Sequence, residues 1–188
     1  MPHASRMLAA ALTVATATTL AGCGSDSDGY GDADVAYASD VTVHHAQTLQ
    51  VLDLSLGRQS LDPELGAFAD ETRKQIFAEV EVTQKWLKRN GEEVPKTALE
   101  HSHADQPSYD TSIPGVLPED RLHQLEKARD PEFQAAWLDA LIVQEEGAVE
   151  LAEAAIEEAE DAEITKAAEA DLERHREQLD RLRDIAAG

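Results

Sequence analysis

The sequence predicts an all-α protein: a four-helix bundle made of two helical hairpins, joined by a long crossover that contains a short extra helix. Three observations lead to this prediction. Apolar residues recur with the period of an α-helix in four long segments, and signals typical of β-strands are nearly absent. Two of the four segments open with an aspartate that suits the N-cap of a helix. At 188 residues, the chain is long enough for one such domain with a sizeable core.

Local signals place the helix boundaries. Asp62 precedes Pro63, and proline is favoured at the first position of a helix. The Asn90-Gly91 pair is a typical stop signal, and Asp130-Pro131 repeats the start signal in the second half. We therefore expect long helices at about 35–56, 63–90, 132–158 and 162–185, and a short one at 118–128. The bundle then spans 36–188, with hairpins at 36–90 and 131–186 and the crossover at 91–130.

The two hairpins resemble diverged copies of one unit. A shift of 100 positions lays residues 41–45 over residues 141–145, and apolar positions coincide. In repeats of this kind, each hairpin cannot bury its apolar face alone and covers that of the other. The repeat therefore supports a bundle whose two halves face each other.

The N-terminus predicts export and lipidation. Arg6 precedes an uncharged run, residues 8–20, which is typical of a signal peptide and too short for the roughly 20 apolar residues that span a bilayer. The run ends in Leu-Ala-Gly-Cys, which resembles the lipobox of bacterial lipoproteins, and Cys23 is the only cysteine. An ordinary signal peptide with a chance cysteine is the alternative. We expect residues 1–22 to be a lipoprotein signal peptide, Cys23 to carry the lipid, and 23–35 to form a flexible tether that is rich in glycine and serine.

The charge of the chain limits its partners. Lys and Arg number 16 against 38 Asp and Glu, which gives a formal charge of −22. Nucleic acid is excluded as a partner, because phosphate binding requires a basic surface. Anionic headgroups would also repel the domain, so its attachment to the membrane must come from the lipid on Cys23. We expect an extracytoplasmic location, lipid-anchored to the cell membrane.

Further residues resemble those of one known family, the domain of unknown function 305. Its first hairpin has an adjacent His-His pair, matched by residues 43–47, and an aromatic-Leu downstream, matched by Trp86-Leu87. The similarity covers residues 36–186. It implies a ferritin-like fold in a secreted bacterial protein, and some members are linked to copper or other metals through His- and Met-rich segments. This chain departs from the pattern, since Gln144-Glu145 replaces the second His-His pair and both methionines lie in the predicted leader.

Helical spacing selects a set of candidate metal ligands. Because neighbours on a helix point about 100° apart, His45 is expected nearer the apolar stripe and His44 at its edge. His175 falls within the apolar face of the last helix, and Glu79 flanks that of the second. Facing helices of a bundle build core sites in this way. The candidate ligands are His44, His45, Glu79, Glu145 and His175.

Imidazole and carboxylate ligands suit a divalent transition metal such as Cu, Zn or Ni. Cu(I) prefers Met and Cys ligands, but the mature chain has no Met and its one Cys, Cys23, carries the lipid. A competing interpretation makes these histidines structural, hydrogen-bonded to Gln144 and Glu145 in a metal-free core, in an envelope scaffold that docks a partner protein. His101 and His103 in the crossover are expected to be incidental. No sequence motif of a known enzyme class stands out. The aromatic residues are expected to pack in the core: Phe68, Phe77, Trp86, Phe133 and Trp137.

Overall fold

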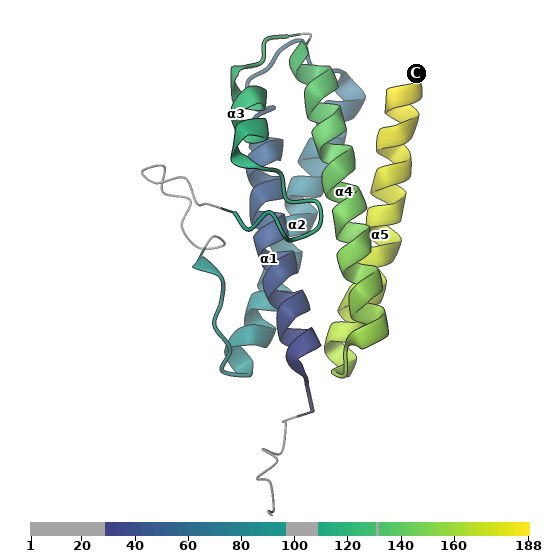
Figure 1. Ribbon diagram of the computed structural model, residues 1–188. Helices are drawn as coiled ribbons and strands as arrows, with labels where there is room; N and C mark the ends of the chain where they lie inside the picture. Colours follow the sequence, from purple (N-terminus) through teal and green to yellow (C-terminus); the bar gives the residue numbers. More distant parts are fainter. Residues whose placement is uncertain (1–28, 97–108, 131) are drawn as a thin grey trace, which may run out of the picture.

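The computed structural model describes residues 29–96, 109–130 and 132–188, and it contains five helices (Figure 1). In these ranges no residue is in a β-strand, so the predicted all-α class is confirmed. The predicted leader, Cys23, most of the tether and the pair His101 and His103 lie outside the described residues. The helices are α1 (Asp32–Asp53), α2 (Pro63–Arg89), α3 (Glu119–Lys127), α4 (Glu132–Glu158) and α5 (Ala162–Ala187).

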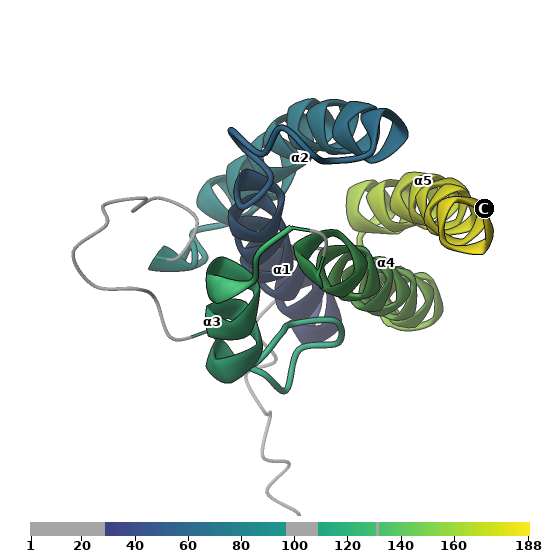
Figure 2. The ribbon, with the colours of Figure 1, turned by 90° about the horizontal axis from the view of Figure 1, so that it is seen from above.

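The four long helices form a bundle in which the two hairpins face each other (Figure 2). Helix α1 packs on α2 and α4, and α4 packs on α5. Helix α3 and the chain before it lie against the side of the bundle formed by α1 and α4. No described helix has an apolar stretch that could cross a bilayer.

An aspartate cap opens the second helix of each hairpin, and the one at Asp62 was predicted. The Asp62 carboxylate accepts hydrogen bonds from the backbone N–H groups of residues 64 and 65, and Pro63 follows it. Asp161 accepts the equivalent pair at the start of α5. Each cap satisfies two of the N–H groups that have no partner inside the helix. The matching caps agree with the predicted repeat of hairpins.

Helix α1 begins earlier than the sequence indicated, so the predicted tether, 23–35, was drawn too long. The buried carboxylate of Asp34 accepts from the backbone N–H of Gly31 (2.7 Å), which closes the first turn. The same carboxylate accepts from the N–H of Asp161 (3.0 Å) in the loop between α4 and α5. A long-range contact therefore orders this end of the helix, and such contacts leave no local sequence pattern.

Two apolar clusters fill the ends of the bundle and leave a polar layer between them. The first cluster is built around Trp137, Phe133 and Phe68, and the second around Trp86 and Tyr37. The indole N–H of Trp137 donates to the carbonyl of Val51 (2.7 Å), which ties α4 to α1. The layer between the clusters consists of buried polar side chains from all four long helices, namely Thr42, His44, His45, Gln47, Thr48, Thr83, Gln144, Glu145, Asp171 and His175.

One residue expected in the core, and one at the end of the first expected helix, are exposed. Phe77 is 59% exposed on α2, so its assignment to the core was wrong. It follows the buried Ile76 directly and therefore points about 100° away from it. Leu56 is 63% exposed because α1 ends at Asp53, before the predicted end at 56, and the chain turns at Gly57.

Candidate metal centre

The polar layer lies where an unpaired group is costly. Transfer of a polar group into an apolar environment without a hydrogen bond costs roughly 1–3 kcal/mol by mutational measures. Most buried polar atoms in proteins are therefore paired. Several imidazole nitrogens of this layer, and one carboxylate oxygen of the neighbouring Glu79, have no hydrogen-bond partner among the described residues.

His175 on α5 is held in one orientation by a carboxylate. Its Nδ1 lies 2.6 Å from Oε2 of Glu145 on α4, and both side chains are buried. Because an ionised carboxylate only accepts hydrogen bonds, Nδ1 carries the proton and the lone pair of a neutral ring lies on Nε2. That Nε2 is buried without a partner among the described residues. A histidine whose second nitrogen donates to a carboxylate is the usual form of a metal-ligating histidine.

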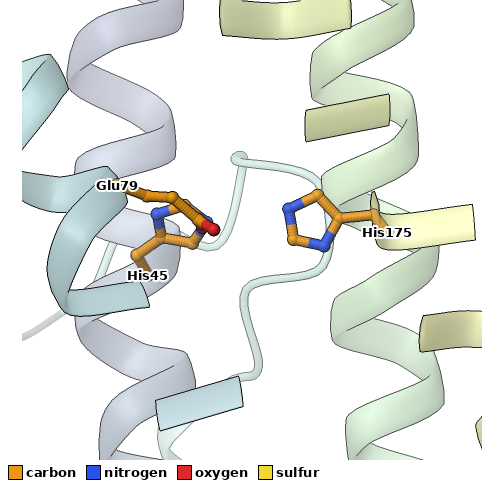
Figure 3. Close-up of side chains that lie close together, drawn as sticks. All are labelled: His45, Glu79 and His175. Carbon is orange, nitrogen blue, oxygen red and sulfur yellow. The ribbon is translucent and has the colours of Figure 1, made fainter. Parts of the chain in front are cut away.

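His45 and Glu79 face His175 from the other hairpin (Figure 3). Nε2 of His45 lies 3.5 Å from Oε2 of Glu79, too far for a hydrogen bond. Neither ring nitrogen of His45 has a partner among the described residues, and neither does Oε2 of Glu79. The other oxygen of Glu79, Oε1, accepts from Nε of Arg174 (2.8 Å). One lone-pair atom of each side chain thus points into the same space.

The three groups are close enough to share one ion. One ligand atom from each of His45, Glu79 and His175 lies within 4.8 Å of the other two. Zinc binds nitrogen and oxygen at about 2.0–2.2 Å, so two atoms on one ion lie up to about 4 Å apart. Small side-chain rotations would close the difference. The arrangement offers two imidazoles and one carboxylate oxygen, from α1, α2 and α5.

The other two predicted ligands have different positions. His44 is buried rather than at the edge of the stripe, and its Nε2 is 3.0 Å from the backbone carbonyl of Gln144. It is buried because the crossover covers this side of α1 at Gly115. Glu145 contacts His175 and lies outside the group of three. The structure thus gathers His45, Glu79 and His175, and places His44 and Glu145 around them.

Burial keeps the imidazoles of His44 and His45 neutral. Loss of solvation lowers the pKa of His44 to about 4, and it lowers the pKa of His45 well below 6.5. Burial raises the pKa of Glu79, and the guanidinium of Arg174 opposes that rise. A neutral imidazole is the form that binds a metal. At neutral pH, His45 therefore needs to lose no proton before it binds an ion.

The depressed pKa of His44 predicts a pH-dependent stability for the metal-free protein. In the unfolded chain this histidine binds a proton below its usual pKa of 6.5, whereas in the folded chain it does so only below a pKa of about 4. The free energy of unfolding then falls by about 3 kcal/mol as the pH falls through this window, at 1.36 kcal/mol per unit. Urea titrations of wild-type and His44→Gln protein in EDTA should show their difference in stability changing by this amount between pH 7 and 4. A constant difference would contradict the burial of a neutral His44, and His123→Gln, an exposed histidine on α3, serves as the control.

Residues 115–117 of the crossover form a strap that hydrogen bonds hold against this layer. The side chain of Gln47 donates to the carbonyl of Leu117 (2.9 Å) and accepts from its N–H (2.6 Å). Gly115 has a φ of +77° and its backbone packs on that of Gly147 in α4. A methyl group at Gly147 would lie 2.2 Å from the Cα of Gly115. The strap therefore closes the α1 and α4 side of the candidate centre.

A small cavity lies on the opposite side, between α2 and α5. Its volume is about 220 Å³, and Arg174, the partner of Glu79, is among its lining residues. Gln75 and Gln178 bridge the two helices beside it, with the amide N–H of Gln178 donating to Gln75 (2.6 Å). This seam is polar, and the side chain of Glu79, whose partner Arg174 lines the cavity, is 16% exposed.

Sequence reasoning missed three residues of the centre. Arg174 bonds both Glu79 and Asp171, and the hydroxyl of Tyr37 donates to Asp171 at 2.5 Å. Arg174 directly precedes His175 in the sequence, and Asp171 lies one helical turn earlier. That spacing places both beside His175 on α5. In a chain with so many charged residues, however, nothing in the pattern separates them from a solvated surface.

Comparison with known proteins assigns the family. The family model described as "Domain of unknown function (DUF305)" matches residues 34–186, most of the chain. The chain belongs to this family. The resemblance expected from the His-His pair and its surroundings is confirmed, and none of the curated proteins matches this DUF305 chain.

Three solved structures share the fold of this DUF305 protein. A DUF305 fragment from Deinococcus radiodurans is 16% identical with a TM-score of 0.69, covering 83% of this chain and 96% of its own. A putative secreted DUF305 protein from Streptomyces coelicolor is 17% identical with a TM-score of 0.68, covering 82% and 91%. CopM, solved in a Cu(II)-bound form, is 18% identical with a TM-score of 0.62, covering 81% and 94%. At these identities the likeness concerns the fold alone.

Proposed function

We propose that this DUF305 protein is a lipid-anchored, extracytoplasmic metal-binding protein that holds one divalent transition metal ion in the core of its bundle. His45, Glu79 and His175 would supply the ligands. Glu145 would orient His175, and His44 would tie α1 to the backbone of α4 at Gln144. The protein would act as a binding module, with no catalytic residue assigned.

One observation carries the proposal. Three lone-pair atoms from three helices lie within 4.8 Å of one another, and His45 Nε2, Glu79 Oε2 and His175 Nε2 all lack a hydrogen-bond partner among the described residues. A single unpaired polar atom in a core is costly, and three that converge would be more so. A cation bound between them would offset that cost.

The ligand set favours particular ions. Two imidazoles with one carboxylate oxygen suit Zn(II), Cu(II) or Ni(II). Cu(I) prefers sulfur ligands, and the described residues contain neither Met nor Cys. The Cu(II)-bound form of CopM supports copper(II) as one candidate. Three protein ligands would leave a coordination position for water or another small ligand.

A second candidate function rests on the same contacts. Glu145 and Arg174 already pair with His175 and Glu79, as a structural core without metal would require. The protein would then be an envelope scaffold whose bundle docks a partner protein. The two candidates differ in one measurable property, the binding of an ion.

A metal titration separates these candidates. The mature domain, stripped with EDTA, is titrated with Zn(II), Cu(II) and Ni(II) by calorimetry, and elemental analysis follows desalting. The proposal predicts one bound ion per chain and a higher melting temperature, because an ion that binds only the folded state stabilises it. No retained metal and an unchanged melting temperature would favour the scaffold.

The anchor requires a separate test. Cys23 is the only cysteine of the chain, so Cys23→Ala should leave the protein unlipidated. Two acyl chains hold a protein on a membrane stably, and we expect the wild type in the membrane fraction. Metabolic labelling with a palmitate analogue, followed by fractionation, checks this. Incorporation of label into the Cys23→Ala variant would contradict the anchor.

A further inference from the structure

Several carboxylates lie close to the candidate centre, which raises the question of which ions it admits. Burial raises the pKa of Glu79, and Glu145 and Asp171 lie close enough to it for their negative charges to raise that pKa further. Calcium takes 6–8 oxygen ligands and magnesium prefers an octahedron of oxygens. A site rich in carboxylates on a chain with a charge of −22 would attract such hard cations.

Most oxygens of these carboxylates are already bonded to other protein groups. Asp171 is engaged through both oxygens, Oδ1 with Arg174 and Oδ2 with the hydroxyl of Tyr37. Glu79 is engaged through Oε1, again with Arg174. Of these four oxygens, only Oε2 of Glu79 is without a partner among the described residues. Oε2 of Glu145 is likewise hydrogen-bonded to Nδ1 of His175.

We infer that Arg174 is a specificity-determining residue of the candidate centre: it presents Glu79 through a single oxygen and occupies Asp171, so the site accepts ions that prefer imidazole and rejects hard cations. The inference rests on the proposed metal site and adds the reason for its selectivity. The guanidinium is suited to this role because its planar fork can bond two carboxylates at once. Its positive charge also opposes any cation that the two imidazoles do not bind strongly.

A selectivity measurement tests the role of Arg174. The mature domain and its variants are titrated with Zn(II) and with Mn(II), a hard ion whose free form is counted by electron paramagnetic resonance. In Arg174→Gln, freed oxygens of Glu79 and Asp171 should raise Mn(II) affinity and lower the ratio of Zn(II) to Mn(II) affinity by at least about tenfold, the size of change that outer contacts impose on metal sites.

Arg181→Gln is the matched control. Arg181 lies two turns along α5, lines the same cavity and pairs with Glu71, which is exposed. Both variants remove one guanidinium from the same helix, so a general effect of charge would appear in both. Lysine keeps the positive charge of Arg174 but not its planar fork, so Arg174→Lys should also lower the ratio, though by less than Arg174→Gln. If Arg174→Gln does not fold, Arg174→Lys takes its place in this comparison.

The outcomes separate the inference from the proposed function. If the wild type binds Zn(II) and its preference is the same in Arg174→Gln as in Arg181→Gln, or in Arg174→Lys where that variant replaces it, the role of Arg174 is overturned and the metal site stands. If the wild type binds no ion, the site itself is overturned, and the selectivity role with it. A fall in the ratio confined to the Arg174 variants supports the inference.

Discussion

Replacing His175 by glutamine should weaken metal binding more than about 100-fold, because even the contacts around metal ligands contribute 10–100-fold to affinity. Glutamine can still donate a hydrogen bond to Glu145, which now receives one from His175. The buried carboxylate therefore keeps a partner and the bundle should fold. His45→Gln should have an effect of similar size, since His45 is the other imidazole of the group. Calorimetric titration with Zn(II) measures both.

The control for these variants is His123→Gln. His123 lies on α3 and its side chain is 60% exposed, so its loss should leave affinity unchanged. Circular dichroism of the metal-free proteins checks that each variant folds. Wild-type affinity in both His45→Gln and His175→Gln would show that the ion binds elsewhere.

Gly147→Ala should destabilise the bundle by at least about 3 kcal/mol, the upper part of the usual range for an overpacked core. Alanine normally stabilises the interior of a helix relative to glycine. Here the new methyl group would lie 2.2 Å from the backbone of Gly115, and backbone cannot yield as the end of a side chain can. The strap would have to move away from α4. This would expose the polar layer and break the hydrogen bonds between Gln47 and Leu117.

Gly66 in α2 provides the matched control for Gly147. A methyl group there meets nothing nearer than 3.9 Å, at the end of the Leu61 side chain. Gly66→Ala should therefore stabilise the protein by up to about 1 kcal/mol through helix propensity. Urea denaturation of the two variants measures the contrast. A Gly147→Ala protein as stable as the wild type would contradict the close packing of the crossover on α4.

The parts of the fold that follow from local chemistry were predictable. Asp62 caps its helix as predicted, and the helical period located the long helices to within a few residues. The position of the crossover, by contrast, depends on two glycines, Gly115 and Gly147, that meet only in the folded chain. No pattern along the sequence signals such a contact.

The candidate site shows the same division. Helical spacing selected His45, Glu79 and His175, because an apolar stripe interrupted by a polar residue is visible in the sequence. It placed His44 at the edge of its helix, whereas the crossover buries it. The spacing also could not identify Arg174, because its importance comes from a carboxylate on α2, a helix from the other half of the chain. Contacts between the hairpins thus decide which of the candidate residues belong to the centre.

The most direct test is anomalous diffraction from crystals of the metal-loaded protein, recorded at the absorption edges of zinc and copper. We expect one strong peak between α1, α2 and α5, about 2.0–2.2 Å from a nitrogen of His45, a nitrogen of His175 and an oxygen of Glu79. Glu145 should remain on the other nitrogen of His175. A peak among surface carboxylates, with these three side chains unmoved and no ion between them, would contradict the account.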